Sequence, residues 1–350
     1  MRYSPLILLL VLTMLSPAAA TEQFPLKAGA GREIPSPIDP TTVEVRDGSQ
    51  TIQLPAGMVF IPAGPFTFGR DEKRDLPAFC IGRFEVTNAE YKMFLEETGS
   101  RATPRYWKQG NYPADKANHP VLFVSLDHAE EYCEWVSKKT GWKVVIPSAV
   151  QWEKAARGPH GYLYPWGNEK DSHFQDGVLE ARFNYNAVCA AHLLSKEAKA
   201  MTEYSSKSSR AGEKCSLDAI TGSRGQLFSV TEDGNVHGWI DHSTNTGFVN
   251  TQYYRDLVDN GGFTTAVGSF PKGVSHYGCH DMAGNAYEWT SNVIIATNGA
   301  EKGKQVNDVR GGSWYSTSRS GMSLCTGEGR LRRGGYHSVG FRVSLDITPK

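Results

Sequence analysis

The sequence lacks an excess of charge of either sign, since Lys and Arg number 37 and Asp and Glu also number 37 in 350 residues. Proteins that hold nucleic acid or anionic lipid through many phosphate contacts normally carry a basic surplus. The charge balance therefore argues against nucleic acid as a partner. Charged residues make up 21% and hydrophobic residues 39% of the chain, which is the composition of a folded globular protein and not of a disordered one.

Beyond its first segment, the sequence also lacks any apolar run long enough to span a membrane, which takes about 20 residues. The marked run at residues 6–15 (LILLLVLTML) is shorter, follows Arg2 and precedes the small residues 16–20 (SPAAA). This order is typical of a secretory signal peptide, and no cysteine follows it that would carry a lipid anchor. We therefore expect residues 1–20 to be cleaved before Thr21, and the protein to be exported to the periplasm without membrane insertion.

Cysteine pairs in CxxC spacing are absent, and so is any Cys/His spacing typical of a zinc site. An even number of cysteines in an oxidising compartment permits up to three disulfides, and the alternative is that all are buried thiols packed as small hydrophobic groups. The disulfide that we favour joins Cys189 and Cys215, which bracket a polar stretch. The six cysteines are Cys80, Cys133, Cys189, Cys215, Cys279 and Cys325.

Glycine and aromatic residues are plentiful, with 36 Gly, 15 Tyr, 15 Phe and 8 Trp, which indicates many turns packed by large rings. Helices are predicted where a capping residue precedes an apolar face. They are expected from Thr87 with Glu90, from near Asp127 with Gly141 past the end, and from Ser148 with Gln151.

Strands are predicted over residues 58–62, 66–69, 84–86, 306–309 and 340–345. Residues 21–55 are turn-rich and predict an irregular lead-in, whereas residues 190–260 predict a long insertion or a set of loops. Three short helices, scattered strands and long aromatic-rich loops together predict an irregular α+β domain.

Eight sequence blocks resemble those of one family, the formylglycine-generating enzymes, which are also called sulfatase-modifying factors. The blocks occur in the family's order over roughly residues 57–345, so the resemblance covers most of the chain. It implies one domain over residues 56–347, with a loop-rich fold related to C-type lectins. The blocks are residues 57–69 (GMVFIPAGPFTFG), 85–91 (EVTNAEY), 119–125 (HPVLFVS), 146–158 (IPSAVQWEKAARG), 164–167 (YPWG), 281–289 (DMAGNAYEW), 310–314 (RGGSW) and 340–343 (GFRV).

The resemblance also exposes a missing pair of residues. Enzymes of this family hold copper with two cysteines, placed two and seven residues after the aromatic residue of the block that ends here at Trp314. Those positions are Ser316 and Gly321 in this chain. Copper(I) prefers soft thiolate ligands, so we expect neither bound copper nor the formylglycine reaction.

What remains at this position is expected to be a vestigial pocket with no catalytic residues. Its lining is predicted to include Trp314, Ser316, Arg319, Gly321 and His337. Ser316, His337 and Glu328 are residue types that can serve as nucleophile, base and orienting group. Their spacing does not bring them together, and no nucleophile-elbow pattern surrounds Ser316.

The family's structural calcium sites are expected to be better preserved. By resemblance, Asp281 and Glu288 would supply side-chain oxygens to one calcium ion, and Gly284 and Ala286 would supply carbonyl oxygens. Calcium prefers such hard oxygen ligands. A second site would use Asn184, the carbonyl of Tyr185, an acid near position 261 and the carbonyl of Phe263, but residue 261 is Gly261.

Three functions remain open at this point. The first is an exported, non-catalytic regulatory or binding protein that contacts an envelope partner. Family members of this profile include periplasmic regulators that act upstream of a membrane serine/threonine kinase in type VI secretion. The second is a periplasmic enzyme with altered chemistry, acting in siderophore or peptide maturation, and the third is a carbohydrate- or ligand-binding module.

Overall fold

The structure is a computed structural model that describes residues 36, 42–47, 50–168, 182–184, 229–230, 236–237, 252–297, 301–314, 316, 324, 327–345 and 347. The expected signal peptide, the expected disulfide between Cys189 and Cys215, and the predicted site residues Tyr185, Arg319 and Gly321 lie outside these residues. No helix within the described part of the chain combines the length and apolar character that a membrane span requires.

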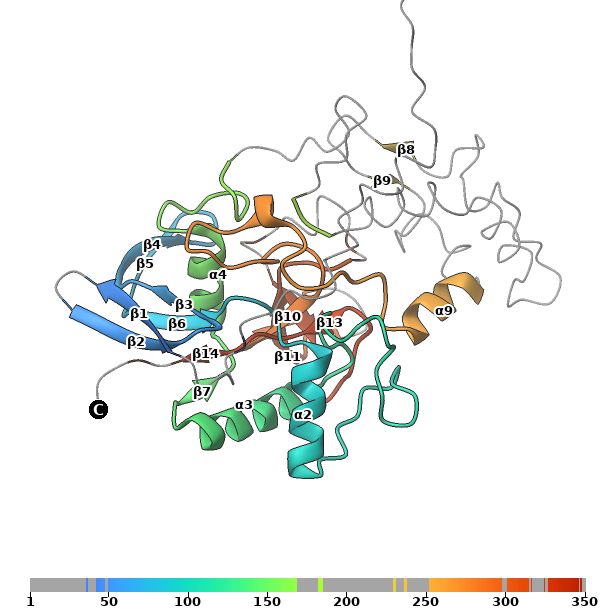
Figure 1. Ribbon diagram of the computed structural model, residues 1–350. Coiled ribbons are helices and arrows are strands. Elements are labelled where there is room, and N and C mark those ends of the chain that lie inside the picture. The colour runs from blue at the N-terminus through green and yellow to red at the C-terminus, as the bar shows by residue number, and fades with distance from the viewer. Residues whose placement is uncertain are drawn as a thin grey trace, which may run out of the picture.

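A four-stranded antiparallel sheet joins residues from both ends of the domain. Its order is β3 (Met58–Ile61), β6 (Phe79–Gly82), β14 (Ser344–Leu345) and β7 (Val144–Val145). Ser344 pairs with Ile81 on one side and with Val145 on the other. Figure 1 shows α4 above these strands and α2 and α3 below them.

A second four-stranded sheet occupies the centre of Figure 1. Its order is β12 (Glu328–Arg330), β11 (Gln305–Arg310), β10 (Tyr287–Ile295) and β13 (Val339–Gly340). β10 pairs antiparallel with β11, whereas it pairs parallel with β13 over Tyr287 and Glu288. The first four residues of β10 are all buried, and the strand then alternates between exposed and half-buried residues.

Three antiparallel hairpins complete the described strands. One of them, β1–β2, lies within the segment that we expected to be an irregular lead-in, so that expectation is wrong for residues 42–55. The hairpins are β1 (Thr42–Asp47) with β2 (Gln50–Pro55), β4 (Gly64–Phe68) with β5 (Glu72–Leu76), and β8 (Ser229–Val230) with β9 (Val236–His237).

The helices begin at side chains that cap their first turns. Thr87 accepts a hydrogen bond from the Glu90 amide at the start of α2 (Asn88–Thr98), and Ser148 accepts one from the Gln151 amide at the start of α4 (Ala149–Arg157). Both predicted capping boxes are confirmed. They could be predicted because the two partners in each box are only three residues apart.

The start of α3 (Leu126–Thr140) differs from the prediction. The capping residue is Ser125, whose hydroxyl accepts from the His128 amide, and Gly141 lies just past the end of the helix as predicted. Asp127 lies in the first turn, where its carboxylate accepts a hydrogen bond from the Arg332 guanidinium. Two shorter elements are α9 (Gln252–Asp259) and the 3-10 helix η2 (Pro271–Gly273).

Three further expectations need correction. Residues 84–86 form no strand, and the strand that precedes α2 is β6, which ends at Gly82. The predicted strand over residues 340–345 is divided into β13 and β14, which belong to different sheets. The predicted insertion at 190–260 contains the helix α9.

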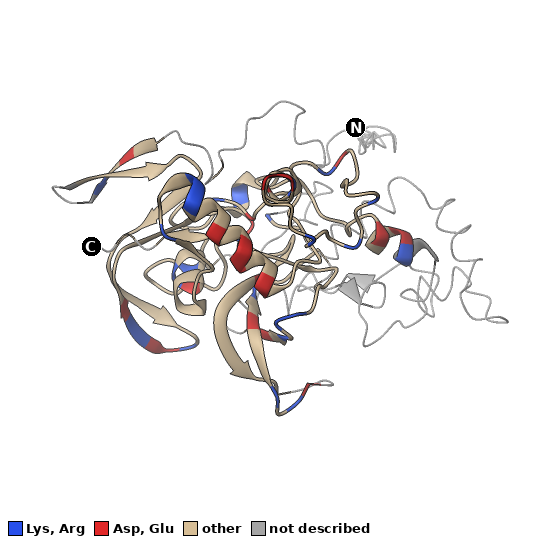
Figure 2. Ribbon diagram, turned by 90° about the horizontal axis from the view of Figure 1, so that it is seen from below, with Lys and Arg blue, Asp and Glu red and all other residues tan. Residues whose placement is uncertain are grey.

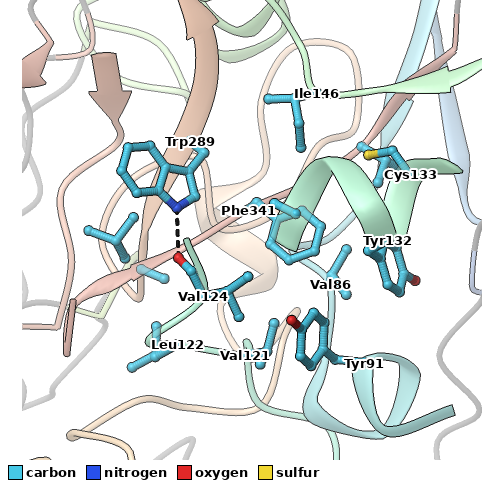
Figure 3. Packing of buried hydrophobic residues seen from close by; sticks show 14 of the residues in the cluster. Val86, Tyr91, Val121, Leu122, Val124, Tyr132, Cys133, Ile146, Trp289 and Phe341 are labelled. Atoms are coloured by element: carbon cyan, nitrogen blue, oxygen red, sulfur yellow. Dashed lines mark hydrogen bonds between the residues drawn. The ribbon is translucent and has the colours of Figure 1, made fainter. Parts of the chain in front are cut away.

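One hydrophobic core lies where α2, α3 and the central sheet meet. Figure 3 shows Tyr91 of α2 and Tyr132 of α3 beside Phe341. The ring centroids of these three residues are 5.4–6.3 Å apart. Trp289 of β10 is fully buried and its indole nitrogen donates to the carbonyl oxygen of Val124 at 2.9 Å. This core fixes β10, from which the candidate site is built.

Cys80, Cys133 and Cys279 are buried free thiols. Burial raises the pKa of Cys80 to about 12 and that of Cys279 to about 11. These thiols therefore stay protonated at neutral pH and pack as small hydrophobic groups. The alternative that all six cysteines are buried thiols holds for these three, and the other three lie outside the described residues.

Candidate functional site

The loop after β11 brings Trp314 and His337 together. Gly311 and Gly312 have φ values of 93° and 76°, in the left-handed region that glycine adopts at low cost. Trp314 is fully buried, and its indole nitrogen donates to the His337 carbonyl oxygen at 3.2 Å, with the two rings 5.8 Å apart. A Cβ atom on Gly262 would lie 2.4 Å from that indole nitrogen, so only glycine fits there.

Ser316, at the position of the family's first copper cysteine, is buried and hydrogen-bonded within the protein. Its hydroxyl oxygen accepts from the Ser313 amide at 3.0 Å and donates to the Tyr287 hydroxyl at 3.3 Å. Only 6% of Ser316 is exposed. The side chain is thus held by neighbouring polar groups of the protein.

Tyr287 continues this hydrogen-bonded path to the surface. Its hydroxyl donates to Glu328 Oε1 at 2.6 Å, and Arg330 Nη2 donates to Glu328 Oε2 at 2.8 Å. Burial and the neighbouring Glu328 carboxylate raise the pKa of Tyr287 above its usual range. Tyr287 therefore keeps its proton at neutral pH and links Ser316 to a half-exposed carboxylate.

The structure brings together only some of the residues that the sequence singled out. Ser316 reaches Glu328 through Tyr287, whereas His337 contacts Trp314. We assigned Tyr287 no role from the sequence, although it lies in the block DMAGNAYEW. Its partners lie 29 and 41 residues further along the chain, and no local spacing predicts contacts at such separations.

The segment before β10 turns tightly around the residues expected to hold calcium. Asp281, Gly284 and Asn285 all adopt the left-handed backbone region, with φ values of 55°, 76° and 58°. The Asn285 amide donates to the Asn184 carbonyl oxygen at 2.7 Å. A Cβ atom on Gly284 would lie 2.1 Å from that same oxygen, so the close approach of the two segments requires glycine.

Glu288, at the start of β10, is completely buried in an ion pair. Arg342 donates to both of its carboxylate oxygens, with Nε at 2.5 Å and Nη2 at 2.6 Å, and the Trp152 indole nitrogen donates at 2.7 Å. Arg342 also donates to the carbonyl oxygens of Gly82 and His280. This pairing joins β10 to the segment that follows β13.

Two further acids lie close to this ion pair. Asp281 Oδ2 accepts from the Gly268 amide at 2.6 Å, and Glu85 Oε1 accepts from the Asn285 side-chain amide at 3.2 Å. Burial, together with the charges of Asp281 and Glu288, raises the pKa of Glu85 well above its usual value. Burial likewise raises the pKa of Asp281 to about 6.

The first calcium set fits its ion in donor type, although Arg342 already neutralises the Glu288 carboxylate. Asp281 and Glu288 offer carboxylates, and Gly284 and Ala286 would offer carbonyl oxygens of the curled segment, which are ligands that calcium prefers. Among the described residues, no three acidic, histidine or cysteine side chains are arranged to hold a metal ion. Carbonyl oxygens or water would therefore have to complete the coordination, and the bound ion would hold the curled segment against β10.

The second calcium set fits less well. Asn184 Oδ1 is buried and has no hydrogen-bond partner among the described residues, while its Nδ2 donates to the Phe263 carbonyl oxygen at 2.8 Å. Gly261 offers no carboxylate, and the Lys116 ammonium lies 2.7 Å from the Gly262 carbonyl oxygen. A fixed positive charge on this loop disfavours a second divalent cation, so this set remains a prediction that the local charge does not support.

Comparisons with known proteins identify the family and support the fold. Residues 45–210 and 206–347 match the family described as sulfatase-modifying factor enzyme 1-like domain. The structure of PvdO from Pseudomonas aeruginosa has a TM-score of 0.51 at 20% identity, covering 87% of this chain and 98% of that one. That likeness supports the loop-rich α+β fold.

Three curated relatives show how the sequence is shared. The inactive C-alpha-formylglycine-generating enzyme 2 of Bos taurus is 28% identical over 343 residues, covering 82% of this chain and 87% of that protein. The formylglycine-generating enzyme of Thermomonospora curvata is 28% identical over 170 residues, 33% of this chain and about half, 54%, of that protein. The serine/threonine-protein kinase Pkn1 of Chlamydia trachomatis serovar L2 is 31% identical over 172 residues, 42% of this chain and 26% of the kinase.

Proposed function

Because the chain belongs to the family of sulfatase-modifying factor enzyme 1-like domains, we propose that it is an exported regulatory or binding protein without formylglycine-generating activity. The observation that carries this proposal is the environment of Ser316. Its hydroxyl, at the position of a copper-binding cysteine, bonds to the Ser313 amide and the Tyr287 hydroxyl. A protonated hydroxyl is a poor ligand for copper(I), which prefers thiolates.

Two relatives support a regulatory function. One of them, which this chain matches over most of its length, is named an inactive formylglycine-generating enzyme. Another carries its matching stretch within a serine/threonine-protein kinase. We propose that the partner is an envelope protein, namely the periplasmic part of a membrane serine/threonine kinase pathway such as that of type VI secretion.

The proposed absence of formylglycine-generating activity is tested with a sulfatase-type cysteine peptide and copper(I). We expect mass spectrometry to find no aldehyde product from this protein, while a formylglycine-generating enzyme under the same conditions converts the peptide. Detection of the aldehyde, or tight uptake of copper(I), would overturn the proposal.

The partner is tested by cross-linking the tagged protein in intact cells and identifying the proteins attached to it. We expect the periplasmic part of a membrane kinase, or a protein of the same pathway, to be recovered. Recovery of neither would contradict the regulatory role, even if the formylglycine reaction is absent.

The hydrogen-bonded path from Ser316 through Tyr287 to Glu328 favours one second candidate, a periplasmic enzyme of siderophore or peptide maturation. When Ser316 gives up its proton to Tyr287, the proton of Tyr287 can pass to the half-exposed Glu328 carboxylate. Ser316→Ala and Tyr287→Phe would then abolish maturation of the substrate in cells, with His337→Ala as a third variant. Under the regulatory proposal, all three variants leave maturation unchanged.

A further inference from the structure

We propose that the ammonium group of Lys116 takes the place of the second calcium ion that the family resemblance implies. The loop of residues 261–264 is then held by a cation that belongs to the chain itself, and its position against Trp314 does not depend on a metal ion. Lys116 is not among the residues that the sequence singled out. The inference goes beyond the proposed function and does not depend on it.

The first observation is that oxygen atoms of one curled loop surround the Lys116 ammonium. Its Nζ atom donates to the Gly262 carbonyl oxygen at 2.7 Å, to the Thr264 hydroxyl at 3.1 Å and to the Gly261 carbonyl oxygen at 3.4 Å. An ammonium group has three N–H donors and no acceptor, so these three oxygens match its capacity. Only 8% of Lys116 is exposed, and a charge buried to this extent requires such partners.

The second observation is that the expected acid does not fit at position 261. A Cβ atom on Gly261 would lie 2.6 Å from the Tyr106 ring. The φ of Gly261 is 81°, in the left-handed region that glycine adopts at low cost. One calcium ion with one carboxylate would leave a single positive charge at this loop, and Lys116 beside Gly261 supplies the same single charge.

The third observation is that two of the expected ligands are bonded to each other. Asn184 Nδ2 donates to the Phe263 carbonyl oxygen at 2.8 Å. An ion between these two residues needs an oxygen from each, because calcium binds oxygen atoms, whereas here an N–H group faces the carbonyl oxygen. Asn184 Oδ1 has no partner among the described residues, so it is the oxygen that an ion could still use, and a count of bound calcium tests this.

Lys116 also connects the loop to the start of α2. Its own carbonyl oxygen accepts a hydrogen bond from the side-chain amide of Asn88, the first residue of α2, at 2.8 Å. Gly262 in turn packs against the Trp314 indole, where a Cβ atom would lie 2.4 Å from the ring nitrogen. The Lys116 ammonium therefore fixes the loop beside Trp314 relative to a helix of the core.

Lys116→Ala tests the proposal because it removes the ammonium and leaves a space that n-propylammonium, which matches the atoms removed, can enter. Hydrogen exchange measured by mass spectrometry follows the backbone of residues 257–265, and thermal unfolding follows the whole protein. We expect exchange in this segment to be at least about tenfold faster in the variant, and the melting temperature to fall by several degrees. Propylammonium chloride should partly restore both, whereas tetramethylammonium chloride, which has no N–H donor, and calcium chloride should not.

Lys154→Ala is the matched control. The Lys154 ammonium is also buried and donates to the carbonyl oxygens of Pro62 and Gly64 at 2.7 and 2.9 Å. Its loss should lower the melting temperature but leave exchange in residues 257–265 unchanged. If Lys116→Ala does not fold, Lys116→Met keeps an unbranched apolar chain without the charge and should show the same faster exchange.

The proposal is overturned if calcium restores Lys116→Ala as well as propylammonium does, or if the folded variant does not respond to propylammonium. Exchange in residues 257–265 that is as slow in Lys116→Met as in the wild-type protein would equally contradict it. Calorimetric titration with calcium gives a separate check on the wild-type protein. We expect no more than one calcium ion per chain, at the first set, and a second bound ion would show that the loop takes a metal ion after all.

Discussion

At the residue scale, the hydroxyl group of Tyr287 links Ser316 to Glu328, two residues that are not paired through their backbones. It accepts a hydrogen bond from Ser316 and donates one to Glu328. Both Ser316 and Tyr287 are buried, and the Tyr287 hydroxyl is the acceptor for the Ser316 proton. Removal of this single oxygen atom therefore tests whether the hydrogen bonds from Ser316 through Tyr287 to Glu328 form in solution.

We predict that Tyr287→Phe lowers the free energy of unfolding by about 1–2 kcal/mol, because it leaves the buried Ser316 hydroxyl without its acceptor. Urea unfolding followed by circular dichroism measures this change. Tyr336→Phe is the matched control, since Tyr336 accepts a hydrogen bond from the exposed Leu331 amide. A loss in the control as large as that in Tyr287→Phe would show that the buried path has no special role.

We expect His119 to make folding sensitive to acid. Burial and the nearby Lys116 charge lower its pKa to about 3, so the folded protein holds it neutral, bonded to the Thr264 hydroxyl. In the unfolded chain it takes up a proton near pH 6.5. Its contribution to stability is thus complete above that pH and is lost as the pH falls from about 6.5 toward 3.

We predict that wild-type stability falls between pH 6.5 and 4 by up to about 1.4 kcal/mol per pH unit more steeply than that of His119→Asn. Asparagine can keep a hydrogen bond to Thr264 and does not titrate. Denaturant unfolding at several pH values compares the two proteins. Parallel pH profiles would show that His119 is protonated in the folded state as readily as in the unfolded one.

At the scale of elements, the start of α3 shows how closely two candidate caps compete. Asp127 stands three residues before Glu130 and resembles the start of a capping box, yet the hydroxyl of Ser125 caps the helix. Asp127 instead shares an exposed ion-pair cluster with Arg332. Which residue caps a helix depends on the direction in which the chain approaches the first helical turn, and this direction cannot be predicted from the local sequence.

We predict that Ser125→Ala costs about 1 kcal/mol of stability, as expected for loss of a helix cap. Asp127→Ala removes only an exposed ion pair and should cost less, about 0–1 kcal/mol. Thermal unfolding of the two variants provides the comparison. If Asp127→Ala is the more damaging change, the carboxylate contributes more to the helix than its exposed position indicates.

Local signals in the sequence predicted elements whose partners are close along the chain. The capping boxes at Thr87 and Ser148 are confirmed, because each needs only a residue three positions on. The strand β10 was not predicted, because all of its first four residues are buried and so do not alternate. Its parallel partner, β13, follows some fifty residues later.

The same distinction applies to the candidate site. The resemblance identified the position of Ser316, and Trp314 and His337 are indeed in contact. The bond between Glu85 and Asn285 spans 200 residues, and the path from Tyr287 to Glu328 spans 41. Contacts of this kind depend on how the two sheets are assembled, and a short sequence motif does not predict that assembly.

At the scale of the whole molecule, a buried ionic network holds three elements in place. Glu153 of α4 accepts hydrogen bonds from Arg157, from Arg310 of β11 at 2.6 Å, and from the Gly69 amide in the β4–β5 turn at 2.6 Å. Its side chain is fully buried. In the ribbon of Figure 2, basic and acidic residues occur in several separate elements of the described chain.

We predict that Glu153→Gln destabilises the protein by about 3–5 kcal/mol, because the buried Arg157 guanidinium loses its counter-charge and Arg310 keeps only Asp308. Glu97→Gln makes the same change in an exposed pair with Lys139 and should cost no more than about 1 kcal/mol. Calorimetric melting of both variants checks the difference. Equal melting temperatures would show that the network adds little to stability.

The strand β14 lies between β6 and β7, which precede it in the chain by some two to three hundred residues. Neither β6 nor β7 can pair with β14 until residue 345 has left the ribosome. Closure of this sheet therefore follows the synthesis of every other described strand and helix. A ribosome stalled before Ser344 would hold a chain in which β6 and β7 still lack the strand that lies between them.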